Sequence, residues 1–275
     1  MKKSIYNYPQ YYEIGFSYRD IPKEVNFLEK CIHRFSKIKV KNILEIACGP
    51  APYLIELLTR GYNYTGLDQN QRMLNYICRD RTLFCPYRRK DETHRSIPID
   101  ADRKIKLMNV DMRNFIIKNK FDMAFVMLGS LQYILNNDDF LQHLNSVANG
   151  LKHGGIYVID NIINHHWYQK KAQREWNIID KEISVTSLFE IPSPDTSISQ
   201  IKSVFATFKI VDKNKHLILS DCEKIKIYYP QEFLLLLKLS KAFEYVGSFE
   251  DFNINKPVRK KIIGYPRIVT ILRKK

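Results

Sequence analysis

Residues 43–68, ILEIACGPAPYLIELLTRGYNYTGLD, decide the fold. The apolar run 43–46 predicts a short buried strand, and two prolines mark a turn directly after it. A helix is predicted over 53–58, ended by Gly61, and residues 62–67 predict the next strand. Strand, turn, helix and strand in this order indicate a βαβ unit, in which the two strands run parallel.

The same alternation continues on both sides of this unit. An amphipathic helix over 21–35 precedes it, and strands and helices follow in turn up to about residue 160. Such alternation predicts a parallel sheet covered by helices on both faces, with the carboxyl ends of its strands at one edge. The expected helices are 72–77 and 138–151, the expected strands are 105–110, 121–128 and 156–159, and a polar insertion is expected over 79–104.

The second half of the chain has a different character. Segments rich in β-branched and aromatic residues predict antiparallel strands, and Pro230 begins a helix that runs to about Ala242. The fold class expected is therefore α/β, a mostly parallel sheet with helices on both faces plus an antiparallel β layer in the C-terminal half. The expected antiparallel strands are 183–189, 199–210 and 217–228, and the final strands are 245–249 and 268–272. The expected units are a helical N-terminal segment (1–38), the core (39–165), an antiparallel insertion (166–228) and a segment completing the core sheet (229–275).

The 275 residues carry a formal net charge of +15, which attracts anions such as nucleic acid or phosphorylated small molecules. No regular aromatic spacing accompanies the densest basic stretch, 79–106, so the charge alone does not predict nucleic-acid binding. No apolar run reaches the roughly 18 residues of a membrane helix, and the start lacks a signal-peptide core. We therefore expect a cytoplasmic protein without a membrane partner. Five scattered cysteines predict neither disulfides nor a metal site.

The stretch 42–53 resembles the first motif of the class I, Rossmann-like S-adenosylmethionine-dependent methyltransferases, which usually reads E/D-x-G-x-G-x-G. Glu45 and Gly49 match that motif, while Ala47 and Ala51 replace the outer glycines. The segments ending at Asp68, Asp111, Tyr133 and Asp160 resemble the motifs that follow, so the likeness covers about residues 40–160. It implies a Rossmann-like fold, methyltransferase activity and S-adenosylmethionine as cofactor. A looser likeness of the C-terminal half to small-molecule N-methyltransferases implies a small acceptor, methylated at an amine or a hydroxyl.

Acidic side chains at the strand ends suit this cofactor. Glu45 can attract the cationic sulfonium and amino group, and Asp68, 19 residues after Gly49, is spaced to accept from ribose hydroxyls. Asp111, with the backbone of Met112, can bind the adenine amino group. The full set of expected cofactor-binding residues is Tyr12, Glu45, Ala47, Gly49, Asp68, Gln69, Met73, Asp111, Met112 and Met127.

The composition of the turn also favours S-adenosylmethionine over a dinucleotide cofactor. Pro50 and Pro52 remove backbone donors that a pyrophosphate would need at a helix N-terminus, whereas a sulfonium needs none. Ala47 and Ala51 preserve close packing if their φ angles stay negative. The alternative is a non-catalytic binding protein, in which these two alanines close the pocket.

Methyl transfer is an in-line displacement, for which positioning and desolvation supply most of the rate. We expect Tyr133 and His166 as catalytic residues. The N-terminal tyrosines resemble the lid of small-molecule N-methyltransferases. A small and, given the charge, anionic molecule is the expected partner, while RNA as the acceptor and a homodimer stay open. Expected substrate contacts are Tyr18, Leu128, Tyr133, His165, His166 and Trp167, and His33, His94, His143, His153 and His216 are expected at the surface.

Overall fold

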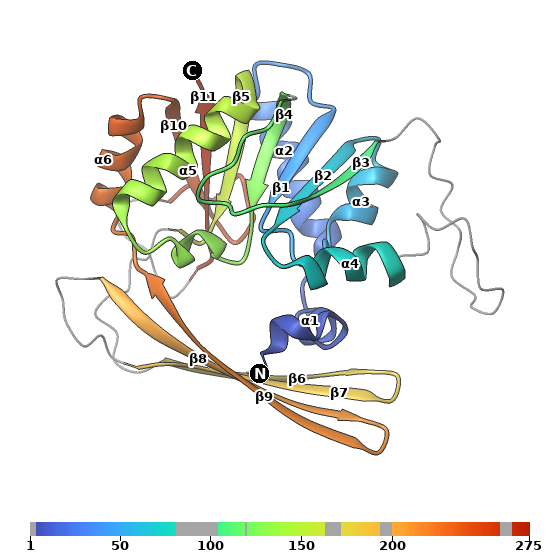
Figure 1. Cartoon of the computed structure of the whole chain (residues 1–275). Helices are drawn as coiled ribbons and strands as arrows, with labels where there is room; N and C mark the ends of the chain where they lie inside the picture. Colours follow the sequence, from blue (N-terminus) through green and yellow to red (C-terminus); the bar gives the residue numbers. More distant parts are fainter. Residues whose placement is uncertain (1–3, 81–103, 119, 163–171, 193–199, 259–265) are drawn as a thin grey trace.

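The computed structural model describes residues 4–80, 104–118, 120–162, 172–192, 200–258 and 266–275. Seven strands form the main sheet in the order β10-β11-β5-β4-β1-β2-β3, and its five central and right-hand strands, β5 to β3, are parallel (Figure 1). β11 pairs antiparallel with β5 and with β10. The strands are β1 (Asn42–Ile46), β2 (Asn63–Asp68), β3 (Ile105–Asn109), β4 (Phe121–Val126), β5 (Leu151–Asp160), β10 (Phe243–Glu250) and β11 (Ile268–Lys274).

Successive residues of the central strands enter apolar clusters on opposite faces of this sheet, as the pleat of a strand requires. Ile43 of β1 belongs to a cluster with Phe27 of α2 and Leu54 of α3. Its neighbour Leu44 belongs to a second cluster, with Phe140 of α5. Helices cover both faces, which confirms the expected fold class. The helices are α2 (Ile21–Phe35), α3 (Leu54–Thr59), α4 (Gln71–Asp80), α5 (Asn137–Gly150) and α6 (Pro230–Ser240).

A separate antiparallel sheet contains β6 (Ala172–Asp180), β7 (Ile183–Ile191), β8 (Ile201–Asp212) and β9 (Lys215–Lys226) in that order. The antiparallel layer is confirmed, but the sequence does not predict β6. This strand lies at the edge of its sheet and exposes Gln173, Glu175 and Asn177. A strand is predicted from a clear alternation of apolar and polar residues, and a segment with this many polar residues does not show one.

The N-terminal segment lies between the two sheets. The 3-10 helix η1 (Ile5–Asn7) and α1 (Pro9–Gly15) pack on the antiparallel sheet through Ile5 and Ile14, which contact a cluster that includes Phe208. Figure 1 shows α1 between that sheet and the end of the main sheet where β1 and β2 finish. The following helix, α2, packs on the main sheet instead. Among the described helices, none is long and apolar enough to span a bilayer.

His143 corrects a prediction, because it is fully buried rather than at the surface. Its Nδ1 lies 2.6 Å from the carbonyl oxygen of Met112, and its Nε2 lies 2.8 Å from the hydroxyl of Tyr157. A neutral imidazole fits both contacts, with Nδ1 donating and Nε2 accepting. Burial lowers the pKa of His143 from 6.5 to about 4. The sequence conceals this position, because a single histidine on an amphipathic helix does not reveal which face it occupies.

The buried His143 makes stability depend on pH. Because the folded-state pKa is below the unfolded value, the unfolded chain binds the proton first. The contribution is complete above pH 6.5 and is lost as the pH falls toward 4, by up to about 3 kcal/mol. Urea titrations between pH 7.5 and 4.5 should show this loss in the parent chain and a shallower decline in His143→Gln. Parallel pH profiles for the two chains would contradict it.

Candidate active site

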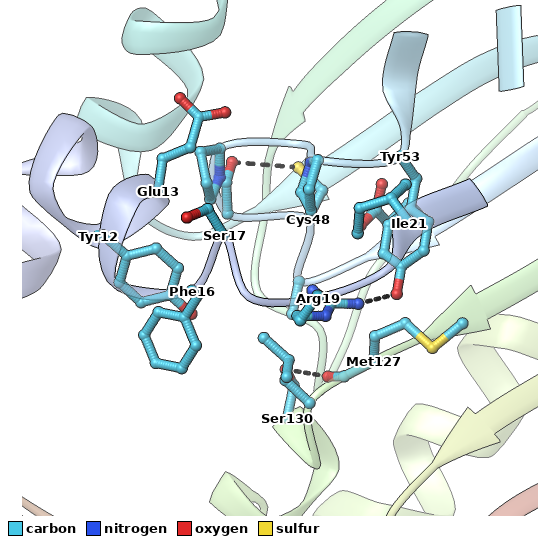
Figure 2. A pocket seen from close by; sticks show the side chains of 16 residues that line it. Tyr12, Glu13, Phe16, Ser17, Arg19, Ile21, Cys48, Tyr53, Met127 and Ser130 are labelled. Carbon is cyan, nitrogen blue, oxygen red and sulfur yellow. Dashed lines mark hydrogen bonds between the residues drawn. The ribbon is translucent and has the colours of Figure 1, made fainter. Parts of the chain in front are cut away.

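A cavity of about 230 Å³ opens where β1 and β4 end, beneath α1 (Figure 2). The turn after β1 forms one wall, α1 and the segment after it form the second, and the loop after β4 forms the third. Of the residues predicted to bind cofactor or substrate, this cavity gathers Tyr12, Glu45, Ala47, Gly49, Met127 and Leu128. It also contains residues that the sequence did not single out as ligands, namely Glu13, Phe16, Ser17, Arg19, Ile21, Cys48, Pro50, Pro52, Tyr53 and Ser130.

The turn after β1 has left-handed backbone angles that its sequence does not predict. Ala47, Gly49 and Ala51 adopt φ angles of 53°, 54° and 51°, so the condition of negative φ for the two alanines is wrong. Backbone hydrogen bonds impose this path, because Cys48 N–H donates to the carbonyl oxygen of Leu67 at 2.9 Å and Ala51 N–H donates to that of Cys48 at 2.9 Å. A Cβ at Gly49 would meet no atom within 4 Å, so open space lies beside this backbone. The turn therefore forms a cradle of the kind a ligand backbone contact needs.

Ala47 offers a direct test of the strain in this turn. The left-handed region costs a non-glycine residue about 1–2 kcal/mol, and a β-branched side chain more. Ala47→Gly should leave the free energy of unfolding unchanged or raise it by up to about 1 kcal/mol, since relief of strain offsets the added entropy of the unfolded chain. Ala47→Val should lower it by about 2 kcal/mol. Chemical denaturation of both variants checks this, and equal stabilities would show that the turn is not strained.

Asp68 ties this turn to the end of β2. Its Oδ2 accepts from Gly49 N–H at 2.8 Å, and its Oδ1 accepts from Asn70 N–H at 2.8 Å. Burial raises the pKa of Asp68, and the N–H groups of Asn70 and Gly49 oppose that rise. The carboxylate therefore holds the cradle in position and has remaining lone pairs for a ligand hydroxyl.

Glu45 lies at the floor of the cavity, at the carboxyl end of β1. It is 3% exposed, and the hydroxyl of Tyr64 on the neighbouring strand donates to its carboxylate. Its carboxyl oxygens border the cavity, where they can accept hydrogen bonds from a cationic ligand group.

Arg19 lines the cavity and belongs to an ion-pair network that the sequence did not predict. Its side chain is 4% exposed, and its guanidinium donates to Glu24, at 2.5 Å for Nη2, and to the Tyr53 hydroxyl. Figure 2 shows the guanidinium beside Tyr53, within the cavity wall. Within the described residues, Nη1 of Arg19 has no protein hydrogen bond, so it can donate to a ligand anion. The only signal in the sequence was a tyrosine-rich stretch that ends in Arg19.

Asp160 holds in position the loop after β4, which forms the third wall of the cavity. Its Oδ2 accepts from Leu128 N–H at 2.6 Å, and Arg267 donates to both of its oxygens, at 2.8 Å from Nε and 2.5 Å from Nη2. Arg267 also approaches Glu24 at 3.4 Å, which joins this clamp to the Arg19 network. Leu128 itself has a φ of 57°, so the clamp stabilises a loop backbone that is unfavourable by itself.

Several predicted cofactor residues lie outside the cavity lining, and Asp68 is one of them, although it holds Gly49 of that lining. Asp111 is engaged by Arg113, whose guanidinium lowers the pKa of that carboxyl and donates to it at 2.5 Å. The carbonyl oxygen of Met112 is held by His143, and Met73 is buried in α4. The carbonyl oxygen of Gln69 accepts from Asn109. These residues follow or flank the ends of β2 and β3, at the same edge of the sheet as Asp68.

An aromatic wall extends from the cavity toward the antiparallel sheet. The Tyr12 and Phe16 rings are 4.6 Å apart, and Phe16 lies 5.9 Å from Trp176 of β6. Tyr18 lies 5.5 Å from the same indole and is 54% exposed, outside the cavity lining. Burial raises the pKa of Tyr12, so its hydroxyl is protonated at neutral pH. His165, His166 and Trp167 lie outside the described residues.

Tyr133 faces Tyr6, a residue that the sequence pattern did not single out. Its hydroxyl lies 3.2 Å from that of Tyr6 on η1. Asn70 donates to the carbonyl oxygen of Tyr6 at 2.9 Å, and Asp221 of β9 accepts from Ile5 N–H at 2.9 Å, so η1 connects the Asp68 turn, Tyr133 and the antiparallel sheet. Burial raises the pKa of Tyr133, which makes this phenol a hydrogen-bonding group and not a base at neutral pH.

Solved structures share the fold over nearly the whole chain. An S-adenosylmethionine-dependent methyltransferase from Clostridium acetobutylicum superposes with a TM-score of 0.72, at 22% identity, covering 96% of each chain. The sugar N-methyltransferase KedS8 from Streptoalloteichus gives a TM-score of 0.70 at 15% identity, covering 98% of this chain and 93% of its own. The amino pentose methyltransferase CalS10 from Micromonospora echinaspora, solved with S-adenosylmethionine bound, gives 0.65 at 11% identity, covering 92% of each.

Similarity in sequence covers less of the chain than similarity in structure. No protein-family model matches it. YqeM of Bacillus subtilis, described as a candidate methyltransferase, is 25% identical over 119 residues, which are 43% of this chain and 41% of that protein. The chain thus spans about two fifths of the length of this curated relative. Together with the cradle after β1 and the acidic residues at the ends of β1 and β2, the superpositions show that the chain has the fold of the Rossmann-like S-adenosylmethionine-dependent methyltransferases.

Proposed function

We propose that this protein transfers a methyl group from S-adenosylmethionine to an amine of a small molecule. The observation that carries the proposal is the cavity bounded by the left-handed turn after β1, with the buried Glu45 carboxylate in its wall and Asp68 fastening the turn. Negative charge for a sulfonium and amino group, and an open cradle for a ligand, are the features this cofactor requires.

The residues present fit each part of the cofactor. Tyr12, Ala47 and Met127 line the space for its methionyl portion. Arg19 can donate Nη1 to the carboxylate, and Asp68 can accept from the ribose. When bound, the cofactor supplies the methyl group: the amine lone pair forms the new C–N bond while the C–S electron pair returns to sulfur.

We propose that the acceptor binds beside Tyr6, Tyr133 and Asp221, since the two tyrosine hydroxyls lie 3.2 Å apart and Asp221 accepts from the neighbouring Ile5 N–H. Their hydroxyls and carboxylate can accept hydrogen bonds from an amine and balance the charge of the ammonium product, which then releases its proton to water. This environment supports a basic amine in place of the anionic acceptor expected from net charge. Neither tyrosine needs to act as a base, because a neutral amine attacks without one. The free thiols of the described cysteines, Cys31, Cys48, Cys78 and Cys222, support a reducing, cytoplasmic location as part of this proposal.

Titration calorimetry tests the cofactor. Saturable binding of S-adenosylmethionine and of S-adenosylhomocysteine at micromolar concentrations is expected, while a nicotinamide dinucleotide should not bind, because Pro50 and Pro52 remove donors for a pyrophosphate. No heat with S-adenosylmethionine at high micromolar concentration contradicts the proposal. Release of S-adenosylhomocysteine in a panel of small amines then identifies the acceptor class, and release without any added amine serves as the blank.

A further inference from the structure

The basic residues gather at the edge of the main sheet opposite the cavity. In a parallel sheet the amino ends of the strands share one edge, and here lysines precede or begin β1, β3, β4, β5 and β10 and end the antiparallel β11. We call this set the amino-edge surface. It comprises Lys37, Lys39, Lys41, Lys104, Lys118, Lys120, Lys152, Lys241, Arg273, Lys274 and Lys275, all exposed except the half-buried Arg273 and Lys274.

Backbone contacts show that these segments adjoin one another. Lys37 N–H donates to the carbonyl oxygen of Gly154, next to Lys152, at 2.9 Å. Arg273 donates to the carbonyl oxygen of Phe35 at 3.2 Å. Lys275 N–H donates to that of Ala242, beside Lys241, at 3.1 Å. Neighbouring residues of β2 join two more segments, because Asn63 N–H donates to the carbonyl oxygen of Lys41 and Tyr64 N–H to that of Lys104. Lys120 donates to the carbonyl oxygen of Asn149, three residues before Lys152. The basic residues therefore form one surface although they come from six places in the sequence.

The acidic residues of these segments do not neutralise the surface. Asp122 is buried and pairs with Lys152 at 2.6 Å, and Glu244 pairs with Arg273 at 2.7 Å. Burial and the neighbouring Lys120 lower the pKa of Lys274, as expected where like charges crowd. Eleven basic residues against these two acidic ones leave the amino-edge surface strongly positive.

The amino-edge surface is separated from the candidate active site by the length of the sheet. Figure 1 shows the C-terminus, next to β11, at the end of the molecule away from α1 and the antiparallel sheet. The cavity opens at the other end, where β1 and β4 finish. A polyanion bound at the basic edge would not deliver its own groups to the cavity, so the charge does not serve to recruit the methyl acceptor.

We propose that the amino-edge surface binds the phosphate backbone of nucleic acid without reading its sequence. Lysine is a flexible point charge that contacts phosphates without base recognition. A lipid surface suits it less, because membrane binding strengthens with an apolar face that inserts. The large apolar residues exposed beside these lysines, Ile116, Leu239 and Tyr245, are single side chains on three separate segments. Seven strands about 4.8 Å apart span roughly 29 Å, the rise of about eight base pairs.

Fluorescence anisotropy with a labelled mixed-sequence 20-base-pair duplex tests this proposal from 50 to 200 mM salt. The variant Lys39→Gln/Lys41→Gln/Lys118→Gln removes three charges from the amino-edge surface. The matched control Lys209→Gln/Lys215→Gln/Lys224→Gln removes three exposed lysines from the antiparallel sheet. Both sets lie at the surface, and circular dichroism verifies that both variants fold.

The amino-edge variant should bind the duplex about tenfold or more weakly at 50 mM salt, and its slope of log affinity against log salt should be shallower by about 2–3. The control should bind as the parent does. Equal weakening in both variants, no binding by the parent chain at 50 mM salt, or tighter binding to vesicles containing anionic lipid than to the duplex would each overturn the proposal. Binding should persist in Asp68→Ala, so the outcome is independent of the proposed methyl transfer.

Discussion

Asp160→Ala should lower the free energy of unfolding by about 3–5 kcal/mol, because it breaks a buried ion pair by removing one partner. Asp160 is 1% exposed and accepts three hydrogen bonds, from Leu128 N–H and from two nitrogens of Arg267. Without it, Arg267 keeps its charge in a partly buried site, and the N–H of Leu128 loses its acceptor. Urea denaturation at pH 7.5 measures the loss.

Two further variants separate the causes. Asp160→Asn retains an acceptor for Leu128 N–H but removes the charge that Arg267 faces, so it should fall between the parent and Asp160→Ala. Glu244→Ala removes the partner of another arginine, Arg273, at an exposed position and should leave stability unchanged within error. If Asp160→Ala were as stable as Glu244→Ala, the clamp would not stabilise the loop after β4.

Asp68→Ala should weaken S-adenosylmethionine binding by about 30- to 1000-fold, which corresponds to about 2–4 kcal/mol. Two losses add here. The ribose would lose its acceptor, and Gly49 N–H would lose the 2.8 Å bond that holds the cradle. Calorimetry measures the affinity, and thermal unfolding without ligand shows how much of the effect comes from the turn itself.

Asp111→Ala is the comparison for this experiment. Asp111 already pairs with Arg113 and, unlike Asp68, accepts no hydrogen bond from the turn after β1, so its removal should weaken binding by less than tenfold. Equal losses for Asp68→Ala and Asp111→Ala would assign both carboxylates to the cofactor. Unchanged affinity in Asp68→Ala would remove its ribose role.

The local sequence pattern was sufficient to predict the strands and helices of the parallel core. The alternation of buried strands and amphipathic helices depends on neighbours three or four residues apart, so a window of sequence contains it. Chain order then predicted that Glu45 and Asp68 would lie at one edge, and both lie at the carboxyl ends of adjacent strands, β1 and β2. The edge strand β6 was not predicted because its polar outer face resembles a loop.

The backbone of the turn could not be predicted from composition. Alanine normally avoids positive φ, so local preference favours negative φ at Ala47 and Ala51, whereas both angles are positive in the structure. Hydrogen bonds from Cys48 to Leu67 and from Gly49 to Asp68 reverse that preference. Both partners belong to β2, so the conformation of the turn is decided by a neighbouring strand.

The sequence by itself determined the parallel sheet and the edge at which its acidic residues collect, because these follow from periodicity and from the order of strands along the chain. Only the tertiary structure decided that Asp160 meets Arg267, 107 residues away, that His143 is buried, and that scattered lysines share one edge. Such contacts arise from packing between distant segments, and no local pattern encodes which residues will become neighbours.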